Sequence, residues 1–250
     1  MTTLAENLAR IQDQIAAACR AANRDRDEIE LMAVSKTYPV EVMAEAAALD
    51  LCLFGENRVQ EFAAKATSGN ALRQRLSNDD ICVHFIGHLQ SNKAAAAAEI
   101  FDAIDSVDSL KLALRLNEAA QKLNRTIPIL LEVKLSPEES KHGLDPASHE
   151  AAELLERLPH LGNLFFEGLM TIAPFGAPDD ETRACFRALR TLSERWAAQY
   201  GGLTFAQLSM GMSGDFPLAI AEGATRIRIG TALFGKRPPT AAQLAAWPES

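Results

Sequence analysis

The stretch LMAVSKTYPVEVMAEAAALDLCLF, residues 31–54, decides the fold. It begins with a short apolar run at 31–35 that suits a buried strand, and it ends with a second such run at 51–54. Between the two runs lies an alanine-rich stretch, residues 40–49, directly after Pro39, and proline is favoured in the first turn of a helix. The pattern therefore predicts a right-handed β-α-β unit with parallel strands.

The same alternation continues along the chain. Further strands are predicted at 82–86, 101–104, 129–133, 165–170, 203–208 and 225–229. Helices are predicted at 57–65, 91–99, 108–123 (capped by Asp108 or Ser109), 146–158, 179–199, 216–222 and 240–247. An additional helix, with apolar side chains from Leu4 to Cys19 at spacings of three and four, precedes the first strand.

Eight successive β-α units favour a single (β/α)8 TIM barrel with an extra N-terminal helix over two doubly wound domains. The predicted connections are short, and no stretch rich in Pro, Gly or Ser divides the chain, so we expect one domain over residues 1–250. The long polar stretch at 67–80 reads as an insertion in a loop.

Charge and composition narrow the classes of function. The chain has 25 Lys and Arg against 33 Asp and Glu, a net charge of −8, which disfavours general binding to nucleic acid or to an anionic membrane. No apolar run approaches the length of a membrane span, and the N-terminal stretch is too charged for a signal peptide. Four scattered cysteines, without a CxxC pair, predict free thiols. We expect a cytoplasmic protein, and a small anionic ligand remains compatible with its charge.

The carboxyl ends of barrel strands carry the active residues of this fold, so the residues after each apolar run are the candidates. Lys36 follows the first run. Partial desolvation there lowers the pKa of a lysine, and a neutral amine is the nucleophile that forms a Schiff base with a carbonyl group. The alternative is a lysine that extends from the strand end into solvent.

Two histidines near the third strand raise the question of a metal. His84 lies in the strand and His88 in the loop that follows it, and no other His, Cys or carboxylate is spaced along the sequence to complete a zinc site. We therefore predict no metal site, and polar residues that shape the barrel mouth instead.

A signal for phosphate comes from two glycine-rich loops, SMGMSGD at 209–215 and GTALFG at 230–235, after the seventh and eighth predicted strands. Barrels frequently bind phosphate there, where backbone N–H groups and helix N-termini point at the anion. Two glycine turns with helix caps are the alternative. Arg228 lies in the last strand, on the same face as Arg226, either for a functional contact or for an ion pair with Glu132, Glu167 or another carboxylate.

A Schiff-base lysine and a phosphate cradle together specify pyridoxal 5′-phosphate (PLP), an aldehyde that carries a phosphate. Here the sequence resembles the pyridoxal phosphate homeostasis proteins, also called the proline synthetase co-transcribed family. The matching stretches are AVSKT (33–37), FGEN (54–57), VQE (59–61), HFIGHLQSNK (84–93), DSVDS (105–109), EESK (138–141), GL (143–144), GLMT (168–171), SMGMS (209–213) and RIGT (228–231).

The resemblance implies a barrel like the N-terminal domain of alanine racemase. It implies PLP on Lys36, with Asn57 near the ring and Arg228 facing the pyridine nitrogen. The phosphate contacts that it implies come from Ser209, Gly211, Ser213, Gly230 and Thr231. Two positions depart from the family pattern: Lys134 stands where asparagine is common, and Arg58 where an aromatic residue is common.

The function that the resemblance implies is intracellular vitamin B6 homeostasis, in which the protein is a carrier for PLP and not an enzyme. We expect PLP itself and PLP-dependent apoenzymes as partners, and a monomer. A weak PLP-dependent amino-acid racemase is the alternative, with Lys36 as one base. Its second acid/base is not identified, since the only tyrosines are Tyr38 and Tyr200. A regulator that docks on other proteins and senses PLP is a third hypothesis.

Overall fold

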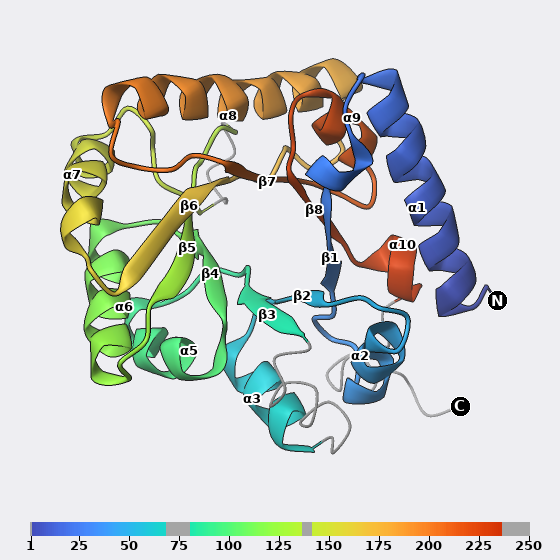
Figure 1. The fold of residues 1–250 in the computed structure, drawn as a ribbon, viewed down its shortest axis with the longest axis horizontal. Coiled ribbons are helices and arrows are strands. Elements are labelled where there is room, and N and C mark those ends of the chain that lie inside the picture. The colour runs from blue at the N-terminus through green and yellow to red at the C-terminus, as the bar shows by residue number, and fades with distance from the viewer. Residues whose placement is uncertain (1, 69–80, 137–141, 237–250) are drawn as a thin grey trace, which may run out of the picture.

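Eight parallel strands close into a barrel in the order of the sequence (Figure 1). The structure is a computed structural model, and it describes residues 2–68, 81–136 and 142–236. The strands are β1 (Glu30–Val34), β2 (Leu53–Glu56), β3 (Cys82–Phe85), β4 (Ala103–Val107), β5 (Ile127–Glu132), β6 (Leu164–Met170), β7 (Gln207–Met212) and β8 (Arg226–Ile229). The predicted (β/α)8 barrel is confirmed.

Helices surround the barrel and alternate with its strands (Figure 1). They are α1 (Leu4–Ala21), α2 (Val40–Ala47), α3 (Val59–Ser68), α5 (Ala94–Ile100), α6 (Leu110–Lys122), α7 (His149–Arg157), α8 (Asp179–Gln199), α9 (Phe216–Ala221) and α10 (Thr231–Phe234). Short 3-10 helices are η1 (Arg26–Glu28), η2 (Ser91–Lys93) and η3 (Leu158–His160). Ser109 caps α6. The sequence did not predict α10, and the helix predicted at 240–247 and most of the predicted insertion lie outside the described residues.

Two strands extend further toward the barrel mouth than their apolar runs predict. β4 includes Asp105 and Ser106, and β7 includes Ser209 and Gly211, which were expected in the loop after the strand. The polar side chains among these residues are buried. Inside a barrel, polar side chains from facing strands satisfy one another, so a strand continues past its first polar residue.

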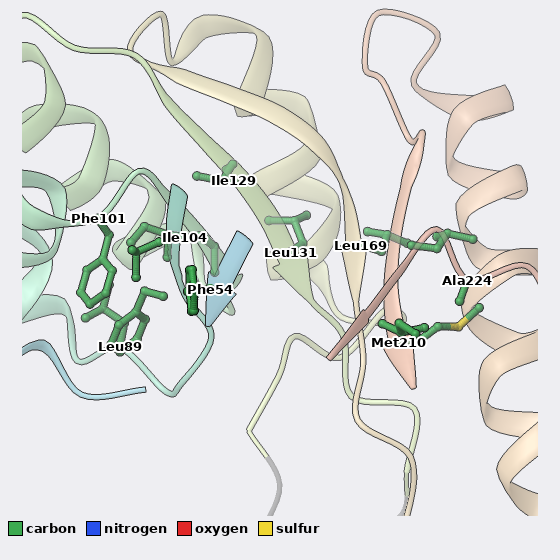
Figure 2. Close-up of a cluster of buried hydrophobic side chains, with 14 of the residues drawn as sticks. Phe54, Leu89, Phe101, Ile104, Ile129, Leu131, Leu169, Met210 and Ala224 are labelled. Carbon is green, nitrogen blue, oxygen red and sulfur yellow. The ribbon is translucent and has the colours of Figure 1, made fainter. Parts of the chain in front are cut away.

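The apolar core lies between the barrel and the helices. Figure 2 shows Phe101 and Leu89 beside Ile104 in one part of the cluster, and Met210 and Ala224 in another. All five are at most 3% exposed. Continuous packing of this kind fixes the strands, and therefore the positions of the loops at their carboxyl ends.

The register of β1 brings three strand ends together. Ala33 pairs with Phe54 of β2 on one side and with Ile229 of β8 on the other. The loops that follow β1, β2 and β8 are therefore neighbours, although they are far apart in the sequence. The helix α1 contacts α10: Asn7 Nδ2 donates a hydrogen bond to the Leu233 carbonyl oxygen at 3.0 Å.

Two smaller predictions concern the cysteines and membrane-spanning helices. Its four cysteines, Cys19, Cys52, Cys82 and Cys185, are all free thiols, as predicted. In the described parts of the chain, no helix combines the length and the apolar character that crossing a membrane requires.

Candidate functional site

A pocket of about 260 Å³ opens at the carboxyl ends of the strands. It brings together two of the predicted site residues, Lys36 after β1 and Asn57 after β2. The other side chains that line it come from the end of β5 and from the loops after β3, β5 and β6, and they include His88, Glu132, Lys134, Ser136, His142 and Ile172. The remaining predicted site residues do not line this pocket.

A buried lysine, Lys65, binds the turn that carries Lys36 through hydrogen bonds. Lys65 Nζ of α3 donates to the Ser35 carbonyl oxygen at 3.0 Å and to Glu56 Oε1 at 2.8 Å. Ser35 Oγ donates to the same Glu56 oxygen at 2.8 Å. The residue directly before Lys36 is therefore bound through both its backbone and its side chain.

The residue directly after Lys36 is held by the same network. The Thr37 backbone N–H donates to Glu61 Oε1 at 2.6 Å, and that oxygen lies 3.0 Å from Lys65 Nζ. Thr37 has a φ of 69°, a left-handed conformation that costs a β-branched residue energy unless its surroundings enforce it. The hydrogen bond from its N–H supplies that constraint, so the position of the Lys36 backbone is fixed on both sides.

The pKa values of the two carboxyl groups in this network shift in opposite directions. Burial raises the pKa of Glu56, whose side chain is fully buried, against the attraction of the Lys65 ammonium group. Burial also acts to raise the pKa of Glu61, but the hydrogen bonds from Thr37 and Lys65 outweigh it, and the net pKa is lowered. Glu61 is therefore the carboxylate of the pair that is more firmly ionised.

Asn57 presents a buried polar atom that the described residues do not satisfy. Its Oδ1 is buried and has no hydrogen-bond partner there. Gly87 packs on its backbone so closely that a Cβ on Gly87 would lie 2.6 Å from the Asn57 carbonyl oxygen. Because a buried acceptor without a donor is costly, Asn57 is suited to a ligand that donates to it.

Arg228 projects into the barrel and makes hydrogen bonds to neutral groups. Its Nη1 donates to the carbonyl oxygen and Oγ of Ser209, at 2.7 and 2.8 Å, and its Nη2 donates to the Thr171 carbonyl oxygen at 2.8 Å. Among the described residues, no carboxylate lies within ion-pair distance of it, so the structural alternative of an ion pair with Glu132 or Glu167 is not observed. Burial lowers the pKa of Arg228, yet the guanidinium stays charged.

The two glycine-rich loops contact each other. Ser213 Oγ, after β7, accepts a hydrogen bond from the Ala232 backbone N–H in α10 at 3.3 Å. α10 begins at Thr231 after its N-cap residue Gly230, with no capping side chain. Gly230 lies beside Val34 at the end of β1, so this pair of loops is adjacent to the turn that carries Lys36.

Two of the predicted phosphate residues also have clear structural roles. Ser209 is fully buried in β7, and its Oγ accepts a hydrogen bond from Arg228. Gly211 has a φ of 92°, and a Cβ there would lie 2.6 Å from the Cβ of Ala219 in α9. The glycine thus allows α9 to pack directly on β7.

Glu132 is a pocket residue that the sequence marked only as a partner for Arg228. It is 6% exposed, at the end of β5, and burial raises its pKa to about 7, against the attraction of Arg228. A carboxyl group in this range exchanges protons at neutral pH. Its position inside an apolar run concealed it, because nothing in the sequence distinguishes an inward from an outward carboxyl group there.

The two histidines near β3 have separate environments. His84 Nδ1 lies 2.9 Å from Asp105 Oδ1, and Arg226 contacts both residues inside the barrel. His88 instead lies at the rim, beside Asp108 and His142. The spacing of residues in the sequence did not reveal these neighbours of His88, because Asp108 and His142 follow other strands.

The two departures from the family pattern occupy different places. Lys134 lines the pocket with Lys36 and adds a second positive side chain to it. Arg58 lines an adjacent groove with Gln90 and Lys93, between α3 and the loop after β3. The matching stretch at 138–141 lies outside the described residues.

Comparisons with known proteins agree with the barrel. The sequence model of the alanine racemase N-terminal domain matches residues 7–238. The pyridoxal phosphate homeostasis protein of Vibrio cholerae is 41% identical over 239 residues, which cover 95% of this chain and 98% of that protein. That of Pseudomonas aeruginosa is 42% identical and covers 95% of this chain and 97% of its own length.

Solved structures give the same result. PipY of Synechococcus elongatus is 42% identical and covers 93% of this chain and all of its own, with TM-scores of 0.79 for the structure described as without PLP and 0.77 for the one with PLP bound. An alanine racemase of Streptomyces coelicolor, 18% identical, shares the fold alone, with a TM-score of 0.64, and this chain covers 59% of it. By its sequence, and by the barrel that carries the matching residues, this chain belongs to the pyridoxal phosphate homeostasis protein family.

Proposed function

We propose that this protein binds PLP through Lys36 at the mouth of the barrel and holds it as an intracellular reserve. The observation that carries this proposal is the turn around Lys36, where a buried network fixes both neighbouring residues and leaves the lysine facing a pocket. The names of the relatives, and the PipY structure with PLP bound, support it.

The residues of the site fit this cofactor. PLP carries an aldehyde, which condenses with a primary amine to a C=N bond and releases one water molecule. Lys36 supplies the amine. Asn57, with an unsatisfied buried Oδ1, would lie near the ring. Arg228 has spent three of its five N–H groups on neutral oxygens, so it retains donors for the pyridine nitrogen.

The phosphate would lie between the two glycine-rich loops. Ser213, Gly230 and Thr231 belong to backbone that meets beside the end of β1, and the first N–H groups of α10 have no intrahelical acceptor. Ser209 and Gly211 would contribute through the same segment. Ser209 has its side chain engaged with Arg228, so we propose its contribution through position and not through a free hydroxyl.

We propose storage as the main role, because an arginine at the pyridine nitrogen disfavours protonation of the ring and so weakens it as an electron sink. The racemase alternative requires a second acid/base. Tyr38 donates to the Gly235 carbonyl oxygen and Tyr200 is bonded to Gln199, and neither lines the pocket. Glu132, with a pKa of about 7, is the pocket residue that favours the alternative.

The remaining parts of the proposal concern the protein in the cell. We propose a cytoplasmic protein, which its four free thiols support, and a monomer that acts as a single domain over residues 1–250. PLP-dependent apoenzymes would be the recipients of the stored cofactor.

Borohydride reduction of the PLP-loaded protein, followed by peptide mass spectrometry, tests the attachment. We expect the reduced adduct on the peptide that contains Lys36. Lys36→Ala should abolish it, and the matched variant Lys134→Ala, in the same pocket, should retain it. An adduct on Lys134 would overturn the assignment.

A second experiment distinguishes storage from racemisation. Exchange of the α-proton of an amino acid in heavy water should be slow in the wild-type protein. Rapid exchange that Glu132→Gln abolishes would establish the racemase instead.

A further inference from the structure

Three potential metal ligands meet at the rim of the pocket, from the carboxyl ends of three consecutive strands. His88 lies in the loop after β3, Asp108 follows β4, and His142 lies in the segment after β5. One ligand atom from each residue lies within 4.8 Å of those from the other two. Neighbouring strands of a barrel bring their loops together in this way, so the cluster follows directly from the fold.

The backbone on each side of the cluster is held in place. Ser106 Oγ donates to the Gly87 carbonyl oxygen, directly before His88. Asp108 precedes Ser109, the N-cap residue of α6. The strand-like bridge between Val133 and Leu144 fixes the segment that carries His142, which is two residues before Leu144.

The side chains already have a relation typical of a metal site. His88 Nδ1 lies 3.0 Å from Asp108 Oδ2, so an imidazole nitrogen and a carboxylate oxygen already lie at nearly the separation of two ligand atoms on one ion. The rings of His88 and His142 are stacked, with centroids 3.7 Å apart and planes 9° from parallel.

We propose that His88, His142 and Asp108 bind a divalent transition-metal ion of the Zn²⁺ class. Imidazole nitrogens and a carboxylate oxygen are ligands that suit Zn²⁺, Co²⁺, Ni²⁺ and Cu²⁺. Ligand atoms around tetrahedral zinc are roughly 3.4 Å apart, given bonds near 2.1 Å. Rotation of the side chains can bring the ligand atoms to this spacing, because both imidazoles are exposed.

Charged side chains of both signs lie near the proposed metal site. Asp108 supplies a carboxylate to the cluster, and the pocket that His88 and His142 line also contains Glu132, Lys36 and Lys134. With three protein ligands, a fourth position remains for water or a small ligand at the rim of the pocket. The site is separate from the proposed PLP attachment, which uses none of the three residues.

Isothermal titration of Zn²⁺ into the untagged, chelator-washed chain tests the proposal. We expect one Zn²⁺ per chain, and at least a tenfold weaker affinity in His88→Ala and in His142→Ala. The matched controls His149→Ala and His160→Ala remove the other surface histidines and should stay within twofold of the wild type. Lys36→Ala should also bind normally, which separates this result from the fate of the PLP proposal.

A second readout protects the test against misfolded variants. Paramagnetic Co²⁺, added to the wild-type protein, should broaden the imidazole resonances of His88 and His142 first and leave those of His149 and His160 sharp. Wild-type binding no tighter than that of His142→Ala, or uniform broadening of all exposed histidines, would overturn the proposal.

Discussion

Replacement of Lys65 by methionine is the perturbation that best tests the network below Lys36. Methionine is close to lysine in length and fills the same space, but it removes the ammonium group that binds the Ser35 carbonyl oxygen and Glu56. The side chain of Glu56 is fully buried and that of Lys65 is 9% exposed, so water does not replace the lost contacts. The variant leaves a carboxyl group buried without its cation.

The expected cost follows from this burial. Breaking a buried ion pair by removing one partner costs about 3–5 kcal/mol, since the other partner is left desolvated. Glu61 adds little to the loss, because it is 24% exposed and water can solvate it. For a chain of this length, such a change lowers the melting temperature by about 6–20 °C.

Urea unfolding at pH 7.5 measures the effect, with two comparisons. Lys65→Met/Glu56→Gln should recover at least half of the lost free energy of unfolding, because the double variant leaves no buried charge without a partner at this position. Lys122→Met, at an exposed position in the last turn of α6, should change it by less than about 0.5 kcal/mol. A Lys65→Met protein within 1 kcal/mol of the wild type, or a double variant no more stable than the single one, would refute the reasoning.

Five other variants probe the site. Glu132 has a pKa of about 7 in the folded protein and about 4.3 in the unfolded chain, so the folded state loses stability as the pH rises. From pH 4.5 to 7 the free energy of unfolding of the wild type should fall by roughly 3 kcal/mol more than that of Glu132→Gln. The same pH dependence of both proteins in urea unfolding would contradict this. Gly211→Ala should lower the free energy of unfolding by about 2 kcal/mol or more in thermal melts, because Gly211 has a φ of 92° and a Cβ there would lie 2.6 Å from another atom. Gly230→Ala should lower it by less than about 1 kcal/mol, because the nearest atom to its Cβ would be 3.4 Å away. Equal losses would argue against the structural role of Gly211. Gly230→Leu should weaken binding of PLP more than of pyridoxal in fluorescence titrations, and equal losses would indicate a collapsed barrel mouth. Arg228→Gln should weaken PLP binding by about 1–3 kcal/mol in the same titration, and unchanged affinity would remove Arg228 from the site.

The sequence was sufficient for the barrel because its core is periodic. Apolar runs such as 31–35 and periodic stretches such as 179–199 reflect burial directly. The structure has a strand, β1, in the first place and a helix, α8, in the second. Strand ends were less predictable. Asp105 and Ser209 are polar residues whose partners, Arg226 and Arg228, lie in another strand, so no local pattern showed that they belong to the barrel interior.

The same limit applies to the candidate site. Lys36 could be found because it follows an apolar run, and the glycine-rich loops because of their composition. Lys65 looks like one more exposed lysine on a helix, and only the fold reveals that it lies beneath Lys36. His142 could not be connected with His88 for a related reason, since 53 intervening residues conceal a contact that the barrel makes short.

The pairing of β1 with β8 has a consequence for the protein during its synthesis. Lys36 emerges early from the ribosome, but Gly230 and Thr231, which would meet the phosphate, follow roughly 190 residues later. At usual elongation rates this interval is about 10–40 s, during which a nascent chain has the amine of Lys36 without the loops beside it. Asn7 and Leu233 join the two ends of the barrel only after that point. A chain interrupted before β8 would therefore present its lysine to aldehydes without selection for phosphate, and only the completed chain would discriminate between them.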